Sequence, residues 1–169
     1  MATRPTLIQT DPNRRLRLML SYGGWEEESF ADQLPRLLEP LGIDCERAET
    51  ADEVTSLLQQ KSVHIAVVDL RIPVDRTVQE PAGDRVLQLL RRLDAPPPTV
   101  VVRPRQATQR DAMRGLNSAL REGAWTVMDG PVHVEPLLRV LAQLLPVGLA
   151  LPRAVVDVVE HAYTALLNS

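Results

Sequence analysis

The sequence has one cysteine, few aromatic residues and no long apolar run, and each absence narrows the class of protein. Its single Cys45 cannot form an intramolecular disulfide, which favours a reducing compartment. No stretch approaches the roughly 20 apolar residues of a membrane span, and the first residues lack the apolar block of a signal peptide. Aromatic residues make up only 3% of the chain, so leucine, valine and alanine must build its core. We therefore expect a cytoplasmic protein without a membrane partner.

Charge is nearly balanced, and no basic face is concentrated enough for nucleic acid to be the main partner. The 19 lysine and arginine residues are offset by 22 aspartate and glutamate residues, which gives a formal net charge of −3. The three histidines lack the spacing of metal ligands, and no Ser-His-Asp pattern is present. The sequence therefore predicts no metal site, no cofactor, no nucleic-acid partner and no enzymatic activity.

Apolar runs and amphipathic stretches alternate five times along the chain. Strands are expected at 16–20, 43–48, 63–69, 99–102 and 125–128. Helices are expected at 32–41, from residue 51, and at 84–93, 112–120 and 136–145, the first starting near Asp32 because Pro35 belongs in a first turn. Regular alternation of this kind predicts an α/β domain, in which right-handed crossovers place helices on both faces of a five-stranded parallel sheet.

Both ends of the chain differ from this pattern. Residues 1–13 read as a flexible N-terminal arm, 14–146 as the α/β domain and 147–169 as a C-terminal helical extension. In the extension, four apolar residues form one helical stripe: Val155, Val159, Ala162 and Leu166. This amphipathic helix either folds back over its own domain or pairs with a second copy. We expect a homodimer, since such a stripe must be buried somewhere.

The run from Val63 to Pro73 is the most informative segment. Its continuous Val, Ile and Ala residues are typical of a strand buried on both faces, and Asp69 stands at its carboxyl end. Ligands and chemistry gather at the carboxyl ends of the strands in such sheets. Asp69 is therefore the main candidate for a functional residue.

Two segments resemble the response-regulator receiver (CheY-like) domain. The stretch Val67–Pro73 is similar to the phosphoacceptor strand and its D-L-x-x-P-like turn, and Gly123–Pro131 is similar to the G-A-x-x-Y-L-x-K-P segment. The resemblance covers roughly Leu16 to Leu145. It implies a flavodoxin-like, doubly wound (βα)5 fold, two-component signalling with a histidine kinase or an output protein as partner, and Asp69 as phosphoacceptor candidate.

The positions that normally assist the phosphoacceptor are changed. Ser21 and Tyr22 (or Leu20 and Ser21) stand where the family has the acidic pair that holds Mg²⁺. Arg103 replaces the threonine or serine that closes strand four, and Gly130 replaces the lysine before the strand-five proline. This pattern resembles a degenerate receiver, a pseudo-receiver, acting by protein contacts independently of phosphorylation.

Several interpretations stay open from the residues alone. Asp69 either caps a local turn or is still phosphorylated, as in an atypical response regulator, and Glu26–Glu28 are candidates to replace the missing acids. Arg103 either points to water or pairs with Asp69. A different class of function is a small-molecule or nucleotide-binding module at the sheet rim beside Gly23-Gly24. The long loop from Arg71 to Gly83 either covers Asp69 or extends into solvent.

Overall fold

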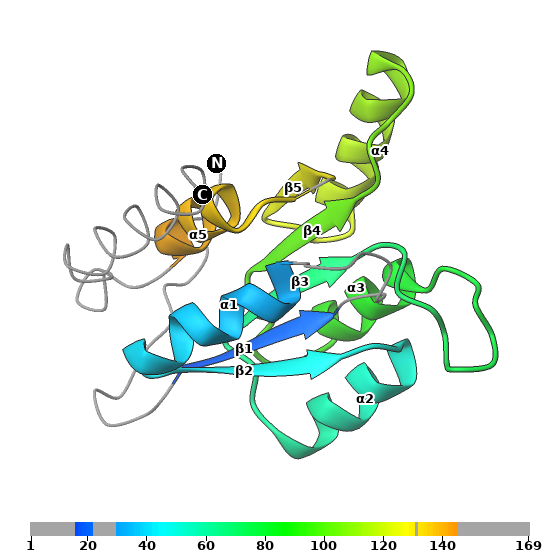
Figure 1. Ribbon diagram of the computed structural model, residues 1–169. Helices are drawn as coiled ribbons and strands as arrows, with labels where there is room; N and C mark the ends of the chain where they lie inside the picture. Colours follow the sequence, from blue (N-terminus) through cyan, green and yellow to red (C-terminus); the bar gives the residue numbers. More distant parts are fainter. Residues whose placement is uncertain (1–15, 22–29, 131, 145–169) are drawn as a thin grey trace.

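The computed structural model describes residues 16–21, 30–130 and 132–144. Its elements follow the expected alternation (Figure 1): β1 Leu16–Ser21, α1 Phe30–Leu38, the short 3-10 helix η1 Glu39–Leu41, β2 Ile43–Ala48, α2 Ala51–Gln60, β3 Ile65–Asp69, α3 Gly83–Arg91, β4 Thr99–Arg103, α4 Gln109–Arg121, β5 Thr126–Asp129 and α5 Val134–Leu144. The five strands pair in parallel in the order β2-β1-β3-β4-β5. The predicted flavodoxin-like (βα)5 fold is confirmed.

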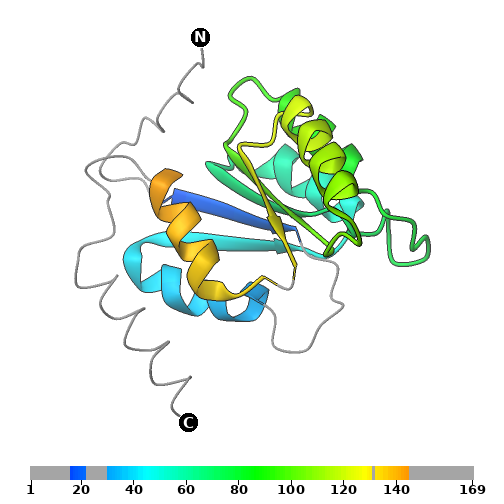
Figure 2. The ribbon, with the colours of Figure 1, turned by 90° about the horizontal axis from the view of Figure 1, so that it is seen from above.

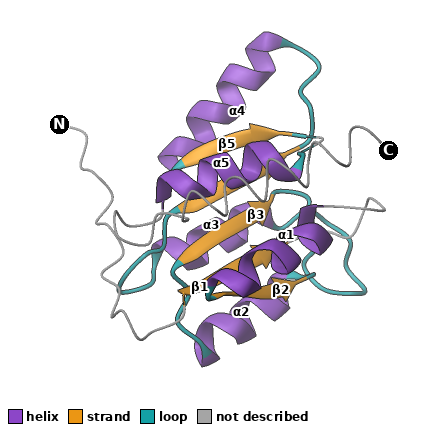
Figure 3. Cartoon of the chain, turned by 60° about the vertical axis from the view of Figure 1, so that its left-hand side comes forward, coloured by secondary structure: helices purple, strands orange, loops and turns teal. Residues whose placement is uncertain are grey.

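Helices cover both faces of the sheet (Figures 2 and 3), and an apolar core lies on each face. One core packs α1 and α5 against the sheet, and the other packs α2, α3 and part of α4 against its opposite face. Alternate residues of each strand belong to different cores, as in β3, where Val67 faces α1 and α5 whereas Val68 faces α2 and α3. This alternation decides which polar side chains can meet at the strand ends.

Local signals fix several element boundaries. The Thr50 hydroxyl accepts a hydrogen bond from the Glu53 N–H (3.1 Å), as the predicted capping box requires, whereas the Glu53 carboxylate accepts one from the N–H of Glu49, the residue before the N-cap (2.7 Å). Helix α1 starts at Phe30, two residues before the predicted start, which leaves Pro35 inside the helix. The prediction that Pro35 lies in the first turn was therefore wrong. The proline removes one intrahelical hydrogen bond from α1.

The segment between β3 and α3 does not extend unattached into solvent: its start is bonded to Asp69 through Arg71, and the residues that follow are bonded to α2. Its first strand-like residues bond to the start of α2, where the Ala51 N–H donates to the Pro73 carbonyl (2.9 Å) and the Asp52 N–H to the Val74 carbonyl (3.1 Å). Asp75 closes the tip, and hydrogen bonds from the Val78 N–H, the Thr77 hydroxyl and the Thr77 N–H lower the pKa of its carboxyl. The segment is therefore a closed loop, which backbone hydrogen bonds hold against the start of α2 (Figure 1).

Helix α4 has the fewest buried residues of the described α-helices. Ala119 is its one buried residue, whereas Met113 and Leu120 expose 53% and 44% of their surfaces.

Among the described residues, no helix combines the length and the apolar character that a membrane crossing needs.

Candidate functional site

Asp69 lies at the carboxyl end of β3 and is completely buried. Its carboxylate accepts three hydrogen bonds from Arg71: from the backbone N–H (2.9 Å), from Nε (3.3 Å) and from Nη2 (3.2 Å). The Ile72 N–H donates to the Asp69 carbonyl (3.1 Å), which completes a turn of the kind that aspartate stabilises. Both carboxylate oxygens are therefore held by the same neighbouring residue, which sequence reasoning missed as a partner.

The residues around Asp69 do not fit the acidic Mg²⁺ site that this type of fold implies. Ser21 ends β1 with its side chain buried and its hydroxyl without a hydrogen-bond partner among the described residues. Tyr22 and the alternative acids Glu26–Glu28 lie outside the described residues. Within the described part of the chain, no three His, Cys, Asp or Glu side chains gather as metal ligands would. Asp69 thus stands there as a single carboxylate already neutralised by a guanidinium.

Arg103 does not pair with Asp69, and it does not point to water. In the sheet register Asp69 lies opposite Val102, so Arg103, the next residue, projects from the other face of the sheet. Its side chain is only 5% exposed, and its guanidinium forms an ion pair with Asp129, the residue opposite it on β5. Both interpretations of Arg103 left open by the sequence are therefore wrong, and the Asp69–Arg103 pair does not form because the two side chains leave the sheet on opposite sides.

The Arg103 guanidinium lies between the sheet and α4. A Cβ atom added to Gly115 would lie 2.5 Å from Arg103 Nη1, so glycine at this position of α4 makes room for the arginine. Nη1 is buried and has no hydrogen-bond partner among the described residues. Arg103 therefore acts as a wedge beneath α4, at the place where a receiver has a small hydroxyl residue.

Gly130 follows β5 and supplies only its backbone to the site. Its N–H donates to the Arg103 carbonyl (2.7 Å), and a Cβ there would come within 3.3 Å of the same oxygen. No lysine can substitute from elsewhere in the fold, because the only lysine of the sequence, Lys61, caps the far end of α2. Of the cations at this edge, those of Arg71 and Arg103 are already paired with carboxylates.

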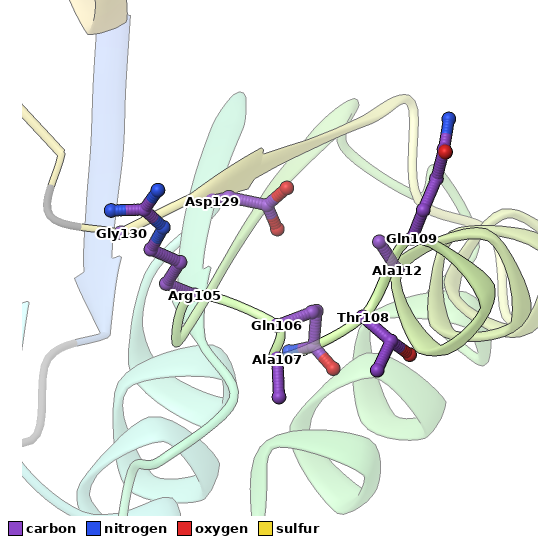
Figure 4. Close-up of a pocket in the computed structure, with 8 residues that line it drawn as sticks. All are labelled: Arg105, Gln106, Ala107, Thr108, Gln109, Ala112, Asp129 and Gly130. Atoms are coloured by element: carbon purple, nitrogen blue, oxygen red, sulfur yellow. The ribbon is translucent and has the colours of Figure 1, made fainter.

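A polar cavity of about 410 Å³ lies between the β4–α4 loop and the end of β5 (Figure 4). Its walls include Arg105, Gln106 and Thr108 from the loop and Asp129 and Gly130 from the strand end. Asp69 does not line it. The cavity is therefore bounded by Asp129, the partner of Arg103, rather than by the phosphoacceptor candidate.

This packing predicts that the effect of Gly115→Ala on stability changes sign when Arg103 is replaced. We expect Gly115→Ala to lower the free energy of unfolding by about 1–2 kcal/mol, because the new methyl group overpacks against Arg103 Nη1. In an Arg103→Met background the same change is expected to raise stability by up to about 1 kcal/mol, since alanine is the better helix former. Urea unfolding of the four proteins measures both effects, and equal effects of Gly115→Ala in the two backgrounds would contradict the wedge.

Comparison with known proteins agrees with this architecture. No family model matches the sequence, and no curated protein matches it. Among solved structures, the CheY-like receiver domain protein from Methanospirillum hungatei JF-1 superposes with a TM-score of 0.57 at 20% identity, covering 76% of this chain and 93% of that one. The signal receiver domain of a DNA-binding response regulator from Colwellia psychrerythraea 34H gives 0.58 at 17% identity, covering 76% and 97%. A receiver domain of a Francisella response regulator gives 0.57 at 18% identity, covering 76% and 95%. The chain therefore has the fold of the CheY-like receiver domain.

Proposed function

We propose that this chain is a degenerate receiver domain that serves two-component-type signal transduction through protein–protein contacts and without phosphoryl transfer. The observation that carries the proposal is the state of Asp69, whose two carboxylate oxygens both accept hydrogen bonds from Arg71. The receiver-like fold supports a signalling role by analogy only.

Phosphoryl transfer depends on positioning and on cations that offset the charge of the transferred group. An attacking carboxylate must also have a free oxygen. Here the neighbouring positions offer a serine hydroxyl at Ser21, a buried arginine paired with Asp129, and the backbone of Gly130. These residues supply neither a second metal-binding carboxylate nor a cation free to meet a phosphoryl group, and Asp69 is better suited to fix the turn after β3.

Intact-mass measurement after incubation with acetyl phosphate and Mg²⁺ tests the proposal. We expect no phosphoryl adduct on the wild-type chain and none on Asp69→Asn, since Arg71 occupies the carboxylate. Arg71→Ala with and without Asp69→Asn extends the test, because it frees the carboxylate without restoring the other groups. An adduct on the wild type that Asp69→Asn abolishes would instead identify an atypical phosphoacceptor response regulator.

The remaining parts of the proposal concern setting and partners. We infer a cytoplasmic protein without turnover chemistry, whose partner is a histidine kinase or an output protein of a signalling pathway. A homodimer formed through the extension 147–169 remains a sequence-based prediction. These residues lie outside the part of the chain that the structure describes. Light scattering over a concentration series checks it, and a mass of one chain at every concentration would contradict it.

A further inference from the structure

Three large apolar side chains are exposed among the described residues, and they lie on two separate surfaces. Met113 and Leu120 lie on the outward side of α4, with the half-buried Leu116 between them. Val78, which exposes 42% of its surface, lies in the loop between β3 and α3. Residues 113, 116 and 120 form the α4 stripe, and residues 75–80 form the loop tip.

The border of the α4 stripe is basic, and its charge is not compensated within the domain. Arg110, Arg114 and Arg121 are exposed, and on a helical projection they follow one another beside the stripe, away from the buried side of the helix. None of the three forms an ion pair with a described residue, whereas most arginines elsewhere in the domain pair with an aspartate or a glutamate. A partner of this surface therefore needs an apolar group with negative charge beside it.

The loop tip carries negative charge around its apolar residue. Asp75 and Glu80 flank Val78 in the sequence, and neither forms an ion pair within the part of the chain that the structure describes. Arg76, the one cation of the tip, is bound to Glu53 in the first turn of α2 (3.1 Å). The tip therefore has the apolar group and the free negative charge that fit the α4 stripe.

Hydrogen bonds already hold the loop tip in one conformation. The Val74 N–H donates to the Glu80 carbonyl (3.2 Å). The N–H groups of Thr77 and Val78 donate to the Asp75 carboxylate (2.7 and 2.6 Å) and lower the pKa of its carboxyl, so Asp75 stays charged at neutral pH. The loop projects from the body of the domain (Figure 1). Because the tip has little conformational freedom left to lose, its binding carries a small entropic cost.

We propose that the loop tip of one copy of this chain docks on the α4 stripe of a second copy. Val78 then covers the apolar stripe, and the acids beside it lie against the arginines beside the stripe. A contact between two loop tips, or between two α4 stripes, would instead bring like charges together, which disfavours binding. Every copy carries both surfaces, so the complementary tip is present wherever the chain is. The contact does not depend on the signalling role of the domain.

Such a contact is heterologous, because it joins different surfaces of the two molecules. Each copy offers one loop tip and one α4 stripe, so it can bind one neighbour through the tip and another through the stripe. The contact lies at the small end of protein interfaces, and we expect weak association that rises with protein concentration and falls with added salt. It is a different contact from the homodimer predicted for residues 147–169.

A charge-swap experiment on the full-length chain tests the docking. Arg114 is the central arginine of the border and Glu80 is an acid of the tip, so we would compare the wild type, Arg114→Glu, Glu80→Arg and the double variant. Arg92→Glu and Asp94→Arg are matched controls, because both residues are exposed, lie outside the two surfaces and change the net charge by the same amounts. Backbone amide NMR spectra at protein concentrations up to about 1 mM report the contact at each surface, and circular dichroism verifies folding.

In the wild type we expect concentration-dependent shifts at both surfaces. Each single charge reversal is expected to weaken association at least about fivefold, and the double variant to regain it to within about twofold of the wild type, with little effect of the controls. A double variant whose loss is the product of the two single losses would show that the surfaces do not meet. Equal weakening by the controls, shifts at the α4 stripe alone, or no shifts in the wild type at about 1 mM would also overturn the proposal.

Discussion

Gly83→Ala is expected to be the most destabilising single methyl addition in the described domain. Gly83 starts α3, and a Cβ there would collide with the backbone of Leu70, approaching its carbonyl oxygen to 2.8 Å and its carbonyl carbon to 2.9 Å, with Cα also too close. A backbone cannot move aside as the end of a long side chain can, so the turn after Asp69 or the start of α3 must shift. We expect a loss of about 3 kcal/mol in the free energy of unfolding.

Thermal and urea unfolding measure this loss, which corresponds to a decrease of roughly 6–12 °C in Tm for a domain of this size. Asp84→Ala is the matched control, since Asp84 is the exposed next residue in the same helix turn and its replacement is expected to cost less than about 1 kcal/mol. Similar losses for the two variants would show that the close approach of Gly83 to Leu70 is unimportant.

Arg71→Met is expected to have the second large effect. It leaves the fully buried Asp69 carboxylate without its guanidinium, and an uncompensated buried charge of this kind destabilises a protein by about 3 kcal/mol. Methionine keeps the length and the backbone N–H, so the hydrogen bond from the Arg71 N–H to the Asp69 carboxylate can remain. The loss therefore reports on the charged side chain.

A double-mutant cycle isolates the pair. Asp69→Asn alone removes the charge but keeps the shape, and Arg71→Met in the Asp69→Asn background is expected to cost less than about 1 kcal/mol. We thus expect a coupling free energy of about 2 kcal/mol between Asp69 and Arg71 from chemical denaturation. Strictly additive losses would mean that the side-chain contact contributes nothing to stability.

The sequence was sufficient for the fold because its signals are local and repeated. Continuous apolar runs mark the strands, and the capping box at Thr50 and the glycine after α4 mark helix boundaries. It also placed Asp69 correctly at a strand end, because a buried strand followed by a turn can be read directly from residue types.

The partners of the site residues were harder to predict, for a geometric reason. Arg103 and Asp129 are far apart in sequence, and their pairing depends on the β4–β5 register, which no local signal gives. The face of the sheet that Arg103 leaves depends likewise on the β3–β4 register, in which Asp69 lies opposite Val102 and not opposite Arg103. Arg71 was missed because nothing in a turn sequence tells that its side chain folds back onto Asp69.

Because Arg103 fits beneath Gly115, the substitutions tolerated at either position depend on which residue the other position already holds. While arginine is present at 103, selection for stability keeps position 115 as glycine, because any Cβ meets the guanidinium. A return to a small residue at 103 would then leave an empty space and a glycine inside a helix, which costs about 1 kcal/mol relative to alanine. The arginine is therefore easier to retain than to lose, and among descendants of such a chain the two positions should change together.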